Sequence, residues 1–270
     1  MRDNSAMFRT RFAGEIVAEF LPPSRPRQKQ TLIILCDGMP SIPRKQPLAE
    51  FLSRNGFWVI YPRYRGAWES DGDFLARSPH EDVLDILNEL PTEIREIAFG
   101  QRFRLSPDRI FVIGGSFGGA AAILLSLDSR IHRVIANCPV VDWSILAKAE
   151  KAETSKSSYA EYIRQAFGNA YRLSDANWTK LRAGDFYNPW SARNEVDGSK
   201  LLMFHAMDDP SVPYERTRKF AEITGATLKT LKRGGHIGTD YITRKYWSEI
   251  RRFFEDAPDD RRPKNRPRMK

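Results

Sequence analysis

The sequence contains little cysteine. Cys36 and Cys138 are the only two cysteines in 270 residues, and each lies within an apolar, strand-like run. A scaffold held together by disulfides is therefore excluded, and we expect two buried free thiols. Because free thiols persist in a reducing compartment, we predict a cytoplasmic location.

Long apolar segments are also missing. No run approaches the roughly 20 apolar residues of a membrane-spanning helix. Residues 1–10 lack the continuous apolar stretch of a secretory signal. We therefore expect neither a membrane span nor a secretory signal. The hydrophobic fraction of 41% still allows a full core, and the length suits one large α/β domain or two small ones.

The net charge of +9 is concentrated partly at the two ends of the chain. Residues 1–30 and residues 256–270 each carry six Lys or Arg against three Asp or Glu. The last segment is polar, contains proline and shows no periodicity, so we predict a disordered or loosely attached tail. Neither interleaved aromatic residues nor a binding motif accompanies the basic ends, so no nucleic-acid partner is expected.

Apolar, strand-like runs alternate with helical patterns along most of the chain. This alternation predicts an α/β fold with a mostly parallel, doubly wound sheet and helices on both faces. In such sheets, ligands bind beyond the carboxyl ends of the strands. The expected strands are residues 14–21, 31–36, 57–61, 110–113, 133–138, 200–205 and 226–231, and the expected helices are 47–54, 79–99, 120–127, 214–224 and 239–254.

The segment from residue 142 to about residue 196 interrupts this rhythm. It is polar, helical in pattern and rich in aromatic residues. Because it follows the carboxyl end of an expected strand, we predict that it forms a helical cap over the catalytic face.

A strand, a sharp turn and a helix surround Ser116 in the pattern G-x-S-x-G. The serine of such a turn takes a strained positive φ, which leaves no room for side chains two positions away on either side. Gly114 and Gly118 occupy those positions. We predict that Ser116 is a nucleophile at a helix N-terminus, where backbone amides favour a developing oxyanion. The alternative is a glycine-rich turn with a bystander serine.

A serine nucleophile needs a base, and the base needs an orienting acid. The sequence has four histidines, and the order Ser, acid, His of α/β-hydrolases favours His236. It lies in a glycine-bracketed loop after the last expected strand. His205 precedes the acidic loop and is interpreted as a packing residue at a strand end. For the acid, Asp208 and Asp209 are neighbouring candidates.

The stretch His205–Pro213 resembles the His-Gly-x-x-Asp-x-x-Val-Pro of prolyl-oligopeptidase-like (S9-type) members of the α/β-hydrolases. This register implies that the acid is Asp209 rather than Asp208. Together with the strand, turn and helix around Ser116, the similarity extends over about residues 31–254. Further segments that resemble this branch are Tyr64-Arg65-Gly66, Asp82–Leu87, Asp108-Arg109-Ile110 and Val141-Asp142-Trp143.

The resemblance implies an α/β-hydrolase domain over residues 31–255, with the cap at about 142–196. An N-terminal strand and connector occupy residues 1–30, and the basic tail occupies residues 256–270. Too little chain precedes residue 31 for the β-propeller that many members carry, so none is expected. The absence of a propeller weakens the case for selection of peptides.

The family's oxyanion loop, His-Gly-Gly-Pro or a tyrosine-containing equivalent, reads Asp-Gly-Met-Pro at Asp37–Pro40. We therefore expect the oxyanion to rest on the backbone amides of Phe117 and Met39. A carboxylate of Asp37 that pointed inward would disfavour the oxyanion. We expect it to point outward as a turn residue.

Aromatic residues are the candidates for substrate binding. We assign Tyr64, from the Tyr-Arg-Gly loop, and Trp143, Tyr187 and Trp190, the cap aromatics nearest the core strands. The alternative is that the cap aromatics pack only between cap and core. No cofactor and no metal are expected, because adjacent residues of His80-Glu81-Asp82 would point to different faces of a helix.

These assignments predict a serine hydrolase that cleaves an ester or amide through an acyl-enzyme, with carboxylesterase as the leading hypothesis. Its partner would be a small-molecule ester or a short peptide; the sequence carries no signal for an oligomeric state. One alternative is a peptidase that releases short N-terminal fragments. The other is a binding protein of the same fold without turnover, which Asp37 near the oxyanion hole keeps open.

Overall fold

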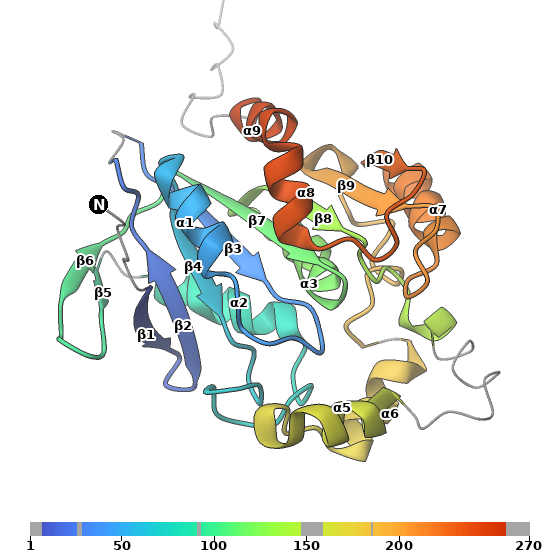
Figure 1. Cartoon of the computed structure of the whole chain (residues 1–270), viewed down its shortest axis with the longest axis horizontal. Helices are drawn as coiled ribbons and strands as arrows, with labels where there is room; N and C mark the ends of the chain where they lie inside the picture. The colour runs from blue at the N-terminus through green and yellow to red at the C-terminus, as the bar shows by residue number, and fades with distance from the viewer. Residues whose placement is uncertain (1–6, 26–28, 91–92, 147–158, 185, 258–270) are drawn as a thin grey trace, which may run out of the picture.

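A twisted eight-stranded sheet forms the centre of the computed structural model, which describes residues 7–25, 29–90, 93–146, 159–184 and 186–257 (Figure 1). From β4 to β10 all neighbouring strands are parallel, whereas β1 and β2, and β2 and β4, are antiparallel. The strand order is β1 (Phe8–Phe12), β2 (Ile16–Leu21), β4 (Trp58–Pro62), β3 (Thr31–Cys36), β7 (Arg109–Gly115), β8 (Ile131–Asn137), β9 (Leu201–Ala206) and β10 (Thr227–Leu231).

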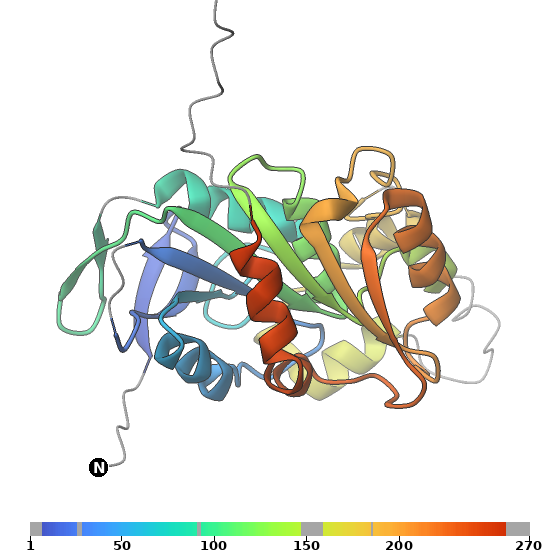
Figure 2. The ribbon, with the colours of Figure 1, turned by 90° about the horizontal axis from the view of Figure 1, so that it is seen from above.

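Helices cover both faces of this sheet (Figure 2). Successive side chains of a strand point to opposite faces, so Leu32 and Ile34 of β3 join one core while Ile33 and Leu35 join the other. Full burial of each such side chain contributes about 1.5–3 kcal/mol relative to exposure. The first core packs against α2 (Pro79–Glu89), α3 (Phe117–Leu125) and α7 (Tyr214–Thr224), and the second against α1 (Gln46–Arg54), α8 (Thr239–Lys245) and α9 (Trp247–Glu255). The predicted doubly wound, mostly parallel sheet is confirmed.

The expected helix over residues 79–99 is too long. The helix α2 ends at Glu89, and two short antiparallel strands follow, β5 (Glu93–Arg95) and β6 (Arg102–Arg104). The sequence places Pro91 just after the helix, and proline cannot continue a helix. Ile97, which the helical pattern placed on the buried face, is 58% exposed.

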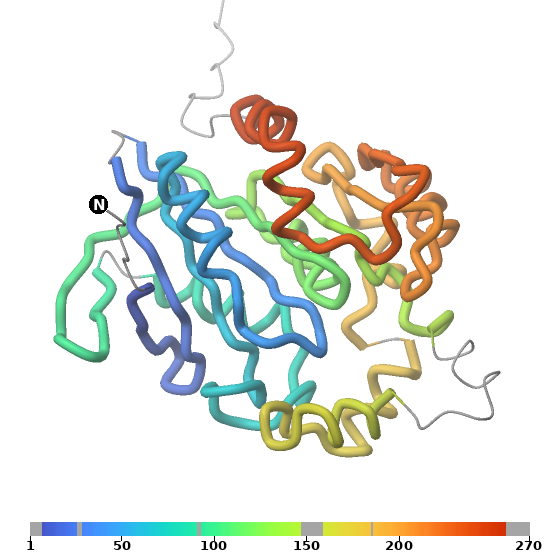
Figure 3. Tube along the Cα trace, in the orientation of Figure 1, coloured from blue at the N-terminus to red at the C-terminus, as the bar shows by residue number. Residues whose placement is uncertain are grey.

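The segment between β8 and β9 is helical. It contains α5 (Tyr159–Phe167), η1 (Gly168–Ala170), α6 (Asp175–Ala183) and η2 (Gly198–Lys200). Isolated bridges join Ala67 to Tyr171 and Phe74 to Leu173, so this segment is attached to the loop after β4 (Figure 3). The helix α6 is capped at its N-terminus by Ser174, whose side chain accepts the Asn177 N–H, and at its C-terminus by Gly184 with a φ of 91°.

Two sequence predictions fall partly outside the described residues. Residues 147–158 of the predicted cap and residues 258–270 of the predicted tail lie outside the described residues. Within the described ranges, no helix combines the length and the apolar character that a membrane crossing requires.

Candidate active site

Ser116 sits at the turn between β7 and α3 with a φ of 56°. A Cβ at Gly114 would overlap the Gly118 carbonyl oxygen, and a Cβ at Gly118 would overlap the Cys36 carbonyl oxygen. The Ser116 N–H donates to the Asn137 carbonyl at 2.9 Å, which holds the turn against β8. A non-glycine residue in this region of backbone space costs about 1–3 kcal/mol. The surrounding structure therefore holds a strained serine at the carboxyl end of a central strand.

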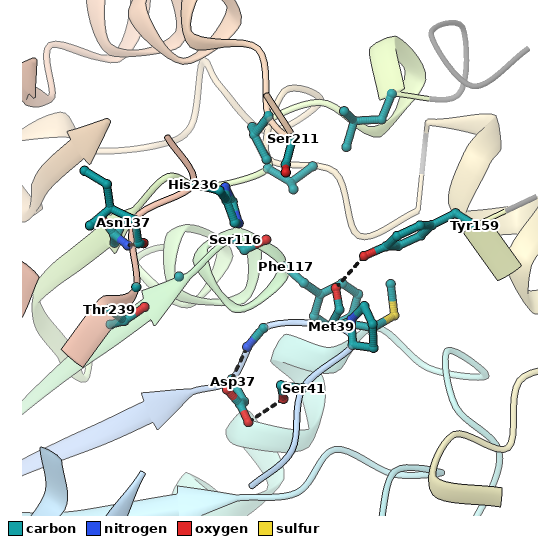
Figure 4. Close-up of a pocket in the computed structure, with 18 of the residues that line it drawn as sticks. Asp37, Met39, Ser41, Ser116, Phe117, Asn137, Tyr159, Ser211, His236 and Thr239 are labelled. Carbon is teal, nitrogen blue, oxygen red and sulfur yellow. Dashed lines mark hydrogen bonds between the residues drawn. The ribbon is translucent and has the colours of Figure 1, made fainter. Parts of the chain in front are cut away.

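His236 and Asp209 form a hydrogen-bonded pair beside this serine. His236 Nδ1 lies 2.8 Å from Asp209 Oδ2, and the Asp209 side chain is fully buried. Since a carboxylate only accepts, Nδ1 carries the proton, and Nε2 is left as the acceptor. Ser116 and His236 line the same cavity and lie next to each other in Figure 4. The three residues predicted as nucleophile, base and acid are thus brought together.

Asp209 is bound on several sides. Its Oδ1 accepts the N–H groups of Ser211 at 2.8 Å and Val212 at 3.0 Å. Burial raises the pKa of Asp209, but hydrogen bonds from His205, His236 and these two amides outweigh it and hold the pKa well below its usual range. The Asp209 carboxyl is therefore ionised near neutral pH and can accept the hydrogen bond from the imidazole.

Sequence reasoning missed the contact that His205 makes with the acid. The His205 side chain is fully buried, and its Nε2 lies 3.1 Å from the Val212 carbonyl oxygen and 3.2 Å from Asp209 Oδ2. Both neighbours are acceptors, so Nε2 carries the proton and donates. His205 was expected only to pack at a strand end; its position four residues before the acid was the available signal.

The loop that carries His236 is held on two sides. Gly234 and Gly235 have φ values of 154° and 60°. Asp208 Oδ1 accepts the Gly235 N–H at 2.9 Å, and Asn137 Nδ2 donates to the Ile237 carbonyl at 2.5 Å. Asp208 therefore contacts the backbone of this loop, while its neighbour contacts the imidazole.

The Asp37 carboxylate is bound within its own turn. Oδ1 accepts the Gly38 N–H at 2.9 Å and lies 3.3 Å from Lys45 Nζ. Oδ2 accepts the hydroxyls of Ser41, at 2.7 Å, and Tyr61. Burial, with the nearby Asp37 charge, raises the pKa of Tyr61, so its hydroxyl stays a donor. This carboxylate is thus compensated by a cation and three donors.

Phe117 and Met39 lie near Ser116 in the wall of the cavity. Phe117 is the first residue of α3, where a backbone N–H has no acceptor within the helix. Met39 lines the cavity together with Ser116 and Phe117 (Figure 4). Both residues predicted for the oxyanion thus line the same cavity as Ser116.

A cavity of about 590 Å³ opens above Ser116. Trp143 lines it, as predicted. Tyr159 and Trp178 also line it and were not predicted. Among its described residues, the segment between β8 and β9 contributes Val140, Trp143, Leu146, Tyr159, Trp178 and Arg182.

Three expected substrate contacts lie elsewhere. Tyr64 is 4% exposed and donates its hydroxyl to the Asp37 carbonyl at 3.2 Å. Tyr187 is 3% exposed and donates to the Phe117 carbonyl at 2.6 Å. The Trp190 ring stacks under the Arg216 guanidinium, 3.2 Å from it. None of these three residues lines the cavity, which corrects the expectation that they contact substrate.

Among the described residues, one group of three potential metal ligands is close enough to share an ion. Cys138, Asp209 and His236 have donor atoms within 4.8 Å of one another. Burial raises the pKa of the Cys138 thiol to about 12, whereas a metal requires the thiolate. The other two are already paired with each other, so the group fits proton transfer better than metal binding.

A sequence model described as the prolyl oligopeptidase family matches residues 47–247. The chain belongs to the prolyl oligopeptidase family. The resemblance found in the sequence is confirmed, and family membership identifies the chain as a serine hydrolase. None of the curated proteins matches the sequence.

Solved structures share the fold at low sequence identity. An esterase of Pyrococcus furiosus is 18% identical with a TM-score of 0.66, covering 93% of this chain and 89% of its own. Est1E of Butyrivibrio proteoclasticus with bound ferulic acid is 18% identical with a TM-score of 0.65, covering 93% and 100%. The acylaminoacyl peptidase of Pyrococcus horikoshii is 17% identical with a TM-score of 0.63, covering 98% of this chain but 43% of its own. These likenesses confirm the α/β-hydrolase fold.

Proposed function

We propose that this member of the prolyl oligopeptidase family is a carboxylesterase that acts through an acyl-enzyme. The observation that carries the proposal is the hydrogen-bonded pair His236–Asp209 beside a serine at positive φ in one cavity. A nucleophile, a base within the same cavity and an acid that orients the base are the parts that acyl transfer needs.

In the proposed reaction, Ser116 Oγ attacks the ester carbonyl and His236 Nε2 takes its proton. The amides of Phe117 and Met39 stabilise the oxyanion. His236 then gives the proton to the leaving alcohol, and the ester C–O bond breaks to leave the acyl-enzyme. In the second half, His236 deprotonates water, which attacks the acyl-enzyme; the proton returns to Ser116 as the acid product leaves.

The charge of the cavity supports an ester over a peptide with a free N-terminus. Among the described residues that line the cavity, Asp37 is the one carboxylate, and it is already paired with Lys45 and hydrogen-bonded within its turn. A free ammonium group would find no available counter-charge there, and burying it unpaired is costly.

An acylated peptide lacks that ammonium group and is the second candidate substrate. The structural likeness to an acylaminoacyl peptidase favours this candidate, and the likeness to an esterase of Pyrococcus furiosus favours an ester. We also propose that residues 142–196 act as the cap of this site, and that the protein, with two buried free thiols, is cytoplasmic.

Covalent labelling tests the proposal. A fluorophosphonate should label the wild-type protein at Ser116 and leave Ser116→Ala unlabelled. Turnover is measured in parallel on p-nitrophenyl esters and on an acetylated aminoacyl p-nitroanilide; the ester should have the higher kcat/KM. Preference for the anilide would favour the peptidase. Labelling without turnover of either substrate would favour a binding protein, and labelling that persists in Ser116→Ala would place the nucleophile elsewhere.

A further inference from the structure

The position of the base determines which part of the cavity receives the acyl group. In acyl transfer the leaving group must lie next to the imidazole, because the imidazole gives it a proton. In Figure 4, His236 and Asn137 lie on one side of Ser116, and Met39 and Tyr159 lie on the other. The acyl group of a bound ester therefore extends away from His236, past the oxyanion loop and toward Tyr159.

The cap contributes mostly apolar side chains to the cavity. Trp143, Leu146, Tyr159 and Trp178 line it together with Arg182, and Tyr159 lies on the acyl side with Met39. Trp143 and Trp178 are only 6% and 8% exposed, whereas Tyr159 is 41% exposed. Of these three rings, Tyr159 thus has by far the most surface left for a bound molecule.

Tyr159 also links the cap to the oxyanion loop. From the first turn of α5, its hydroxyl donates to the Met39 carbonyl at 3.2 Å (Figure 4). Its ring packs against Trp178 of α6 with 6.1 Å between the ring centroids. Burial raises the pKa of Tyr159 to about 12, so the hydroxyl remains protonated and donates near neutral pH. The hydroxyl and the ring of Tyr159 are therefore both held in place on the acyl side of the cavity, one by Met39 and the other by Trp178.

We propose that Tyr159 determines acyl specificity, and that its ring selects esters with a bulky apolar acyl group over acetyl esters. The inference rests on the proposed carboxylesterase function. The apolar acyl group packs on the exposed part of the ring, and the hydroxyl holds the loop that presents the Met39 amide. Ring and hydroxyl thus have separable effects: the ring acts on the choice of acyl group, and the hydroxyl on the rate with every ester.

Two p-nitrophenyl esters, acetate and hexanoate, test the proposal, because they share a leaving group. In Tyr159→Ala, the ratio of kcat/KM for hexanoate over acetate should fall about tenfold or more, the usual scale for lost apolar contacts in a pocket. In Tyr159→Phe, this ratio should stay at the wild-type value, while kcat falls about two- to tenfold for both esters, as expected for one lost hydrogen bond.

Tyr162 provides a matched control. It lies on the same helix and is 46% exposed, and its ring centroid lies 5.8 Å from that of Tyr159. It does not line the cavity. Tyr162→Ala should keep the wild-type ratio. An unchanged ratio in Tyr159→Ala, or an equal change in Tyr162→Ala, would overturn the proposal.

Folding and the underlying function are checked separately. Circular dichroism and fluorophosphonate labelling of Ser116 show whether each variant is folded with an intact nucleophile. If Tyr159→Ala is not folded, Tyr159→Leu serves instead, with the same fall in ratio expected for loss of the ring. A wild-type protein that turns over neither ester would contradict the carboxylesterase function itself, whereas turnover with an unchanged ratio contradicts only the role of Tyr159.

Discussion

The two neighbouring aspartates after β9 bind different partners, which predicts different costs for the same substitution. Asp209 accepts a hydrogen bond from Nδ1–H of His236, whereas Asp208 accepts one from the Gly235 N–H. Asp209→Asn should lower kcat by about 10⁴, as expected when an imidazole loses its oriented acid. Asp208→Asn keeps an oxygen for Gly235 and should cost less than about tenfold. Steady-state kinetics of both variants would refute this assignment if the loss at Asp208 equalled or exceeded that at Asp209.

The low pKa of Asp209 also predicts how stability depends on pH. A carboxyl whose pKa is lower in the native state than its unfolded value, about 3.9, stabilises the fold fully above that value. The contribution is lost as the pH falls below it toward the native pKa. Asparagine does not titrate. Urea unfolding of wild type and Asp209→Asn should therefore show a stability difference that is present above about pH 4 and shrinks below it. A difference that grows in acid would contradict the pKa direction.

At the scale of the secondary-structure element, the strand–turn–helix around Ser116 depends on missing side chains. A Cβ at Gly114 would overlap the Gly118 carbonyl, whereas a Cβ at Gly38 would meet its nearest atoms at 3.7 and 3.8 Å. We expect Gly114→Ala to lower the free energy of unfolding by about 1–3 kcal/mol. Gly38→Ala, at the end of the adjacent strand, should change it by less than about 0.5 kcal/mol. Chemical denaturation of both variants measures these free energies of unfolding. Similar small effects would mean that the turn around Ser116 can relax to make room for the added Cβ.

The elements differ in how far the sequence could predict them. Residues 31–36 could be predicted as a strand because a strand buried on both faces needs a continuous apolar run. The edge strand β1, Phe8–Phe12, has three consecutive polar residues between its two phenylalanines, so it carries no apolar run and was missed. The helix α2 was extended too far because Ile94 and Ile97 continue its period beyond Pro91. Periodicity alone could not distinguish a short hairpin from another helical turn.

At the scale of the whole molecule, the sheet brings distant loops together. Ser116, Asp209 and His236 follow β7, β9 and β10, whose carboxyl ends meet at one edge because these strands are parallel. Order along the chain was therefore enough to predict Ser116 and His236, whereas the choice of Asp209 over Asp208 needed the family resemblance. Tyr159 could not be predicted, since its place at the cavity depends on how α5 docks near Met39, and no repeating pattern encodes that docking.

Trp190 lies at the junction between the cap and the core, and we expect it to act on stability. Its ring lies under the Arg216 guanidinium of α7, and Arg216 Nε donates to Asp142 at 2.8 Å. Because Trp190 joins these parts without lining the cavity, Trp190→Ala should lower stability by about 2 kcal/mol. That corresponds to a fall in Tm of about 4–8 °C. The ratio of hexanoate to acetate turnover should remain unchanged, in contrast to Trp143→Ala, which removes part of the wall. Thermal unfolding and the two-ester assay on both variants test this prediction. A changed ratio in Trp190→Ala would show that Trp190 does affect the choice of substrate.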